Sequence, residues 1–172
     1  MEALAAVRQL GLGDWCIGAG AVRNLVWDAL HERQVASVLA DVDVVYFDAS
    51  DCSPARDEAL RQRLAAAVPS LEWEVTNQAG VHRWFEASFG YPVAPLASLE
   101  DGVASWPEFA TAVGIALDRD GALRVIAPHG LDDLFNMVVR HNPARASVAN
   151  YRERIASKRF AERWPRVTVI AC

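Results

Sequence analysis

Asp-Val-Asp-Val-Val-Tyr-Phe-Asp, at residues 41–48, is the clearest β-strand in this sequence. Valine and aromatic residues favour strands, and successive side chains of a strand point to opposite faces. One face is apolar throughout and holds Val42, Val44 and Tyr46. The other face begins with two carboxylates and ends with two apolar residues, in the order Asp41, Asp43, Val45 and Phe47. The strand therefore combines a core-forming face with a face that can carry chemistry.

The two carboxylates have a spacing that suits a metal ion. Two residues of strand rise separate their Cα atoms by about 6.6 Å, so both side chains can reach one hard cation or bracket two cations about 3.5–4 Å apart. A divalent ion would offset the repulsion between Asp41 and Asp43, which burial makes costly. The alternative is that Asp41 only begins the strand and that Asp43 is solvated at a sheet edge.

A second predicted strand, at residues 71–77, carries a further carboxylate. Glu72, Glu74 and Thr76 alternate along one of its faces. If this strand lies beside the 41–48 strand, Glu74 joins the aspartate pair as a third carboxylate and a candidate metal ligand or general base. The alternative is an amphipathic strand whose glutamates face solvent.

A glycine turn precedes the aspartates and connects a predicted strand at residues 15–17 to a predicted helix. The turn is Gly18-Ala19-Gly20. Glycine lets backbone N–H groups approach a phosphate closely, and a helix N-terminus favours anions. A dinucleotide-binding fingerprint would need a third glycine where Arg23 stands, so that motif does not match. A plain tight turn remains the alternative, and Arg23 either pairs with phosphate or is a surface arginine.

The rest of the chain alternates helices with strands. The helix after the glycine turn is expected to face the core through Val22, Leu25, Val26, Ala29 and Leu30. Further helices are predicted at residues 1–11, 53–68, 81–89, 130–140 and 147–163, a hairpin at 113–117 and 123–127, and a terminal strand at 167–170. This order indicates a single α/β domain, residues 1–172, with a mixed sheet.

Several side chains are expected to be structural. Asp28 is predicted on a solvated helix face, and Trp73, Trp84, Trp106 and Trp164 are predicted in the core rather than on a surface that stacks with bases. The segment 152–166 holds six basic and two acidic residues. It could meet a triphosphate, but a solvated helix docked against the acidic body is favoured slightly.

Composition excludes several classes of protein. With 52% hydrophobic and 23% charged residues, the chain is not a disordered or low-complexity protein. A net charge of −5 disfavours a surface that wraps duplex nucleic acid. Three widely spaced cysteines indicate a reducing compartment without disulfides, and no apolar run reaches the roughly 20 residues that span a bilayer. We therefore expect a cytoplasmic protein without a membrane partner.

Taken together, these motifs resemble the nucleotidyltransferase superfamily of the DNA polymerase beta type. More closely, the chain is similar to a bacterial nucleotidyltransferase-like family that was formerly uncharacterised. The matching runs are GAGAVRNLVWD (18–28), DVDVVYFD (41–48), WEVTNQAGVH (73–82), WPEFATAVGI (106–115), APHGLDDLF (127–135) and the basic tail through Trp164-Pro165. The superfamily usually has serine where Gly20 stands.

The resemblance implies a fold, a reaction and a site. The fold is a twisted mixed sheet flanked by helices, with a C-terminal hairpin and helices. The reaction is Mg²⁺-dependent transfer of a nucleoside monophosphate from a nucleoside triphosphate to an acceptor hydroxyl. Asp41 and Asp43 would hold one or two Mg²⁺ ions, with Glu74 as third catalytic carboxylate. Gly18, Gly20 and Arg23 would bind phosphate.

The resemblance leaves the acceptor open. The acidic charge favours a small molecule or a protein over nucleic acid. Because Gly20 lacks the usual hydroxyl, a catalytically weak or inactive nucleotide-binding or regulatory relative is the alternative function. A plain interaction domain, whose carboxylates are merely solvated, is the third.

Overall fold

The fold is built on a mixed β-sheet with strand order β3-β2-β1-β4-β5. We describe it from a computed structural model that covers residues 1–172. The strands are β1 (Trp15–Gly18), β2 (Val42–Tyr46), β3 (Trp73–Asn77), β4 (Gly114–Leu117) and β5 (Leu123–Ile126). Strands β2 and β3 are parallel, and all other neighbours are antiparallel. The predicted α/β class with a mixed sheet is confirmed.

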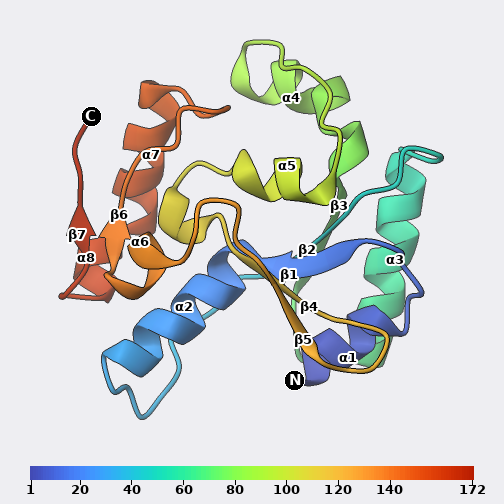
Figure 1. Ribbon diagram of the computed structural model, residues 1–172, viewed down its shortest axis with the longest axis horizontal. Helices are drawn as coiled ribbons and strands as arrows, with labels where there is room; N and C mark the ends of the chain where they lie inside the picture. The colour runs from blue at the N-terminus through green and yellow to red at the C-terminus, as the bar shows by residue number, and fades with distance from the viewer.

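One face of the sheet packs against α1 (Glu2–Arg8) and α3 (Pro54–Ala67), which lie together in Figure 1. The register pairs Val42 with Trp73 and Val44 with Val75, so the apolar faces of β2 and β3 coincide. All four of these side chains are buried in the larger hydrophobic cluster of the protein. Burial of this apolar surface is the main force that holds the two helices against the sheet.

The opposite face of the sheet carries the polar side chains of β2 and β3. Around it lie α2 (Ala19–Leu30), the 3₁₀ turn η1 (Gln78–Gly80), α4 (His82–Phe89), α5 (Leu99–Ala104) and the 3₁₀ turn η2 (Phe109–Thr111). The sequence predicted α2 and α4, and both are present. These elements leave space above the sheet rather than covering it completely.

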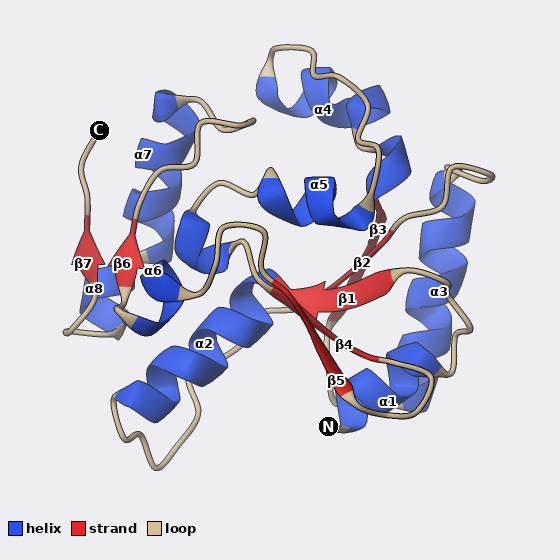
Figure 2. Ribbon diagram, viewed as in Figure 1, coloured by secondary structure: helices blue, strands red, loops and turns tan.

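The C-terminal part of the chain forms a second, smaller packing unit beside α2. It contains α6 (Asp132–Phe135), β6 (Val138–Val139), α7 (Val148–Lys158), α8 (Phe160–Arg163) and β7 (Thr168–Val169). Figure 2 shows β6 and β7 as a separate two-stranded parallel sheet. Trp27 of α2 packs against Phe160 and Trp164 with ring centroids 5.9 and 5.2 Å apart. This aromatic cluster packs the C-terminal segment against α2.

Three sequence predictions were wrong in this region. The helix expected at 130–140 ends at Phe135, because Met137 has a positive φ of 56° and the chain then enters β6. The helix expected at 147–163 is broken at Arg159, whose φ of 51° is left-handed. Leu25 is 66% exposed, because α2 turns Trp27 and Asp28 toward the C-terminal unit. The terminal strand expected at 167–170 is present as β7.

Two further expectations bear on the setting of the protein. The cysteines Cys16, Cys52 and Cys172 are all free. None of the helices combines the length and the apolar character that a membrane crossing requires.

Candidate active site

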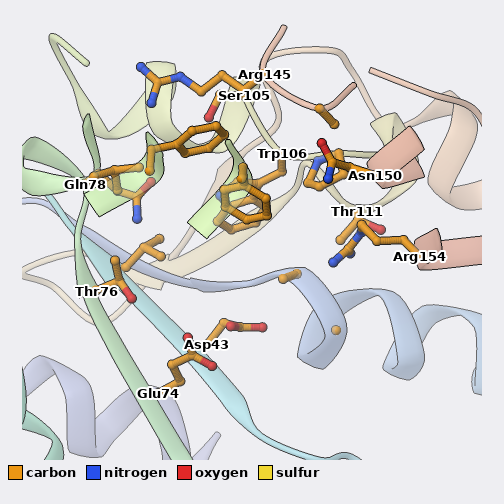
Figure 3. Close-up of a pocket in the computed structure, with 18 of the residues that line it drawn as sticks. Asp43, Glu74, Thr76, Gln78, Ser105, Trp106, Thr111, Arg145, Asn150 and Arg154 are labelled. Carbon is orange, nitrogen blue, oxygen red and sulfur yellow. The ribbon is translucent and has the colours of Figure 1, made fainter. Parts of the chain in front are cut away.

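A cavity of about 390 Å³ lies over the polar face of β2 and β3 (Figure 3). The sheet and the start of α2 form one part of its lining, and α4, the segment after α5 and α7 form the rest. Its size is within the usual range of small-molecule sites, which span about 300–1,000 Å³. The cavity gathers three groups of side chains: carboxylates from the sheet, cations from α2 and α7, and aromatic rings from around α4.

The carboxylates come from two adjacent strands. The parallel register places Asp43 of β2 directly beside Glu74 of β3, and neighbouring strands are about 4.8 Å apart. Asp41 precedes Asp43 by two residues and lines the same cavity. Figure 3 shows Asp43 and Glu74 on the same side of the sheet. The prediction that the two strands are neighbours with their carboxylates on one face is confirmed.

Asp43 is the most perturbed of these acids. Burial, together with the negative charges of Asp41 and Glu74, raises the pKa of Asp43 from 3.8 to about 6. Lys158 and Arg23 act in the opposite direction but do not compensate. The ionised form of Asp43 is therefore poorly compensated by the protein, and a bound cation would stabilise it.

The donor set is the one that hard cations prefer. Mg²⁺ takes carboxylate oxygens together with water and phosphate oxygens, and Asp41, Asp43 and Glu74 offer only oxygen donors. As the side chains lie here, no group of three His, Cys, Asp or Glu residues is gathered closely enough to hold a metal by itself. The residues therefore fit an ion that uses one or two carboxylates and completes its shell with water and substrate.

Arg23 lies at one end of the cavity and is 4% exposed. Its Nη1 donates to Thr111 Oγ1 at 3.2 Å and its Nη2 to Asn24 Oδ1 at 3.0 Å, while its Nε is buried without a partner. Its guanidinium packs 4.9 Å from the ring centroid of Phe160. Burial lowers the pKa of Arg23 to about 10, so it remains charged at neutral pH. The alternative prediction, that Arg23 is a surface arginine, is wrong, because Arg23 is buried and lines the cavity.

One stripe of α7 adds further cations. Asn150, Arg154 and Lys158 are spaced by four residues, and all three line the cavity. Arg154 is held by Glu108, which is fully buried, through hydrogen bonds of 2.6 Å from Nε and 3.1 Å from Nη2. The basic segment 152–166 is thus divided: two of its members reach this cavity, whereas Arg159, for example, pairs with Glu162 outside it. The sequence analysis favoured a solvated helix that docks on the body of the protein, and it did not identify Arg154 and Lys158 as residues of the site.

The two glycines of the turn have different surroundings. A Cβ atom on Gly18 would lie 2.3 Å from the ring of Trp106, so Gly18 is covered by that ring and does not line the cavity. Gly20 does line it, and a Cβ there would meet nothing closer than Arg23 Nη2 at 3.6 Å and Leu39 Cδ1 at 3.8 Å. The space around Gly20 therefore leaves the N-terminus of α2 accessible from the cavity.

Two other expectations were wrong. Asp28 is 7% exposed rather than solvated, and it accepts hydrogen bonds from Ser37 and from Trp164 Nε1 at 2.7 Å. Trp84 is 44% exposed and lines the cavity, whereas Trp73 and Trp164 are core residues as predicted.

Comparisons with known proteins identify relatives of this fold. Residues 5–169 match the family described as Nucleotidyltransferase. A solved structure reported as revealing a CCA-adding enzyme head domain has a TM-score of 0.82 and 30% identity, covering 99% of this chain and 88% of that one. A search of curated proteins found no match.

Two larger enzymes share the fold at lower identity. A tRNA nucleotidyltransferase complexed with a primer tRNA and an incoming ATP analog has a TM-score of 0.55 and 21% identity, over 99% of this chain and 46% of that chain. A tRNA-processing enzyme with CTP has a TM-score of 0.54 and 19% identity, over 98% and 43%. The chain thus spans less than half the length of these enzymes, and the likeness concerns the fold.

Proposed function

Because the chain belongs to the nucleotidyltransferase family, we propose that it moves a nucleoside monophosphate from a nucleoside triphosphate to an acceptor hydroxyl, with Mg²⁺ as cofactor. The observation that carries this proposal is the registered pair of Asp43 and Glu74 on the floor of a cavity whose end is lined by Arg23, Arg154 and Lys158. Carboxylates on one side and cations on the other suit a ligand that is a polyanion and carries a bound metal ion.

Asp41 and Asp43 are the proposed ligands of Mg²⁺, and two ions are possible at this spacing. When bound, the metal would neutralise negative charge on the reacting phosphate oxygens. Glu74 is the third carboxylate, which would either share the metal or take the proton of the acceptor hydroxyl. The raised pKa of Asp43 supports the assignment, since a cation would offset the burial and the neighbouring negative charges that raise it.

The triphosphate would lie along the cationic end of the cavity. Backbone N–H groups at the start of α2, where Ala19 and Gly20 line the cavity, are the proposed phosphate ligands together with the Arg23 guanidinium. Gly18, which was expected to bind phosphate, lies under the Trp106 ring outside the cavity. Arg154 and Lys158 face the same space from α7. The acceptor oxygen attacks the α-phosphorus, the bond from that phosphorus to the β-bridging oxygen breaks, pyrophosphate leaves, and the hydroxyl proton passes to a base.

The acceptor is proposed to be a small molecule or a protein rather than a nucleic acid. The net charge of −5 opposes broad contact with a phosphate backbone. Cytoplasmic location, inferred from the cysteine pattern, is part of this proposal.

A non-catalytic nucleotide-binding role is the second candidate, and Gly20 is the observation that favours it. The missing hydroxyl removes one phosphate donor from the start of α2. A protein with this second function binds a nucleotide and Mg²⁺ but does not release pyrophosphate. A plain interaction domain would bind neither.

Thermal unfolding and calorimetric titration with a nucleotide distinguish these three candidate functions. A nucleoside triphosphate with Mg²⁺ is expected to stabilise the wild-type protein by about 2.7 kcal/mol when its concentration is 100 times its Kd. Asp43→Asn should lose this gain, whereas Asp120→Asn, a charge removal in the exposed hairpin turn, should keep it. Equal metal-dependent stabilisation of Asp43→Asn and wild type would place the site elsewhere. Pyrophosphate release with an acceptor then distinguishes an enzyme from an inactive relative.

A further inference from the structure

Aromatic rings from α4 and the segment after it line part of the cavity, which we call the aromatic end. Arg145 packs over one of these rings, that of Phe85, and Figure 3 shows Arg145 on the side of the cavity away from Asp43 and Glu74. Phe85 is the centre of this group: its ring centroid lies 6.3 Å from Trp84, 4.5 Å from Phe89 and 5.5 Å from Tyr91. All four residues line the cavity. Neither the metal nor the triphosphate of the proposed function needs them, because both ligands are bound by charge.

The exposures within this group are unequal. Phe85 is only 8% exposed and anchors the cluster, whereas Trp84 and Phe89 remain 44% and 43% exposed. Large aromatic side chains that line a cavity with almost half of their surface uncovered offer apolar faces to a ligand. A flat ring is the ligand shape that uses such faces best, because it can stack on one of them.

Two polar groups beside the rings lack partners. Gln78 is 5% exposed and lines the cavity, and the structure gives its side-chain amide no hydrogen bond. The amide packs so closely against α5 that a Cβ atom on Gly102 would lie 2.7 Å from its Oε1. Arg145, 5.8 Å above the Phe85 ring, has a buried Nη1 that is also unpaired. A buried polar atom without a partner, such as Arg145 Nη1, is costly, and the Gln78 amide has its hydrogen-bonding capacity free, so a ligand that pairs these groups gains affinity.

The chemistry that satisfies both observations is a planar ring with a hydrogen-bonding edge. An amide such as that of Gln78 presents one donor group and one acceptor, which is the pattern that pairs with the edge of a base. Figure 3 shows Gln78 beyond Thr76 and Glu74 along β3, so the amide lies just past the end of the strand that carries Glu74. A ring attached to a group that reacts at Glu74 would therefore extend toward the aromatic end.

We propose that the aromatic end of the cavity is a subsite for a nucleobase, which stacks against Trp84 or Phe89 and pairs with Gln78. This inference rests on the proposed function, since the base belongs either to the donor triphosphate or to an acceptor that itself carries a base. Truncation of one stacking ring is expected to weaken binding of the base about fivefold to 150-fold. The phosphate end, which holds no part of this subsite, should be unaffected.

The test compares ligands with and without a base. Wild type, Trp84→Ala and Phe89→Ala are titrated by calorimetry with ATP, CTP, GTP, UTP and inorganic triphosphate, each with Mg²⁺. Phe135→Ala is the matched control, because Phe135 is 51% exposed and lies outside the cavity. If the donor supplies the base, the two cavity variants lose affinity for nucleoside triphosphates and keep it for inorganic triphosphate. Gln78→Leu should then reduce the preference among the four bases.

A second arm identifies an acceptor base. Protein saturated with a non-hydrolysable triphosphate analogue is titrated with free nucleosides; weaker nucleoside binding by Trp84→Ala, at unchanged triphosphate affinity, assigns the subsite to the acceptor. Wild-type affinity of both cavity variants and of Gln78→Leu for every ligand would overturn the proposal. If wild type failed to bind inorganic triphosphate but bound nucleosides through Trp84, the proposed function would fail and the nucleobase subsite would stand.

Discussion

Replacing Asp43 with asparagine should stabilise the apo protein while it abolishes metal-dependent nucleotide binding. Asp43 sits beside Glu74 and close to Asp41, and burial with these two charges raises its pKa from 3.8 to about 6. Between these values the folded protein holds the proton that the unfolded chain has already released. The ionised carboxylate therefore costs stability as pH rises through this window, and the neutral amide of the Asp43→Asn variant does not.

The magnitude follows from the shift. Each pKa unit corresponds to about 1.4 kcal/mol, so the roughly two units at Asp43 amount to about 3 kcal/mol at pH 7. The gain from Asp43→Asn should fall to about 1.5 kcal/mol at pH 5 and to below about 0.5 kcal/mol near pH 3.8, where wild-type Asp43 is protonated in the folded state. The pH dependence, rather than the gain alone, identifies ionisation as the cause.

Urea denaturation in EDTA at these three pH values measures the effect without metal. Asp120→Asn is the control for loss of one negative charge at an exposed position, and its stability should change by no more than about 0.5 kcal/mol. The reasoning is refuted if Asp43→Asn is no more stable than wild type at pH 7, or if its gain is the same at all three pH values.

Three other substitutions test separate parts of the site. Gly18→Ala should lower the free energy of unfolding by about 1–3 kcal/mol in urea, because its Cβ would overlap the Trp106 ring at 2.3 Å; unchanged stability would show that Trp106 can move freely. Gly20→Ser should fold normally, because its Cβ has ordinary contacts at 3.6 and 3.8 Å. In calorimetry Gly20→Ser should raise the affinity for triphosphate, whereas Gly20→Val should lower it. Equal affinities of both variants and wild type would show that the turn has only a structural role. Arg154→Ala should cost about 3 kcal/mol of stability, since it leaves the fully buried carboxylate of Glu108 without its partner, and a loss below about 1 kcal/mol would contradict that.

Much of the fold was predictable from local patterns. The alternation in residues 41–48 and 71–77 identified both strands and the faces that their carboxylates share, because strand periodicity depends only on neighbouring residues. The hairpin predicted at 113–117 and 123–127 is present as β4 and β5, and Gly121 in its turn has a positive φ of 84°. The helix predicted at 53–68 is present as α3.

The predictions that failed depended on contacts between distant segments. Helical periodicity at 130–140 was overridden because the chain there pairs with β7, which lies about 30 residues downstream. Asp28 was assigned to solvent because α2 shows no partner for it in sequence, yet the Trp164 indole nitrogen donates to it across 136 positions. Local propensity is a weak prior wherever such pairings contribute more free energy.

By itself, the sequence determined the class of fold, the carboxylates on one strand face and the glycine turn that opens a helix, since each depends on the geometry of a few adjacent residues. Only the tertiary structure decided that Asp43 and Glu74 lie in register, that Arg23, Arg154 and Lys158 face them, and that Trp84 leaves the core for the cavity. Those arrangements arise when segments far apart in the chain bury apolar surface together. Burial by that packing also sets the pKa of Asp43, so the charge state of the site is a property of the folded protein.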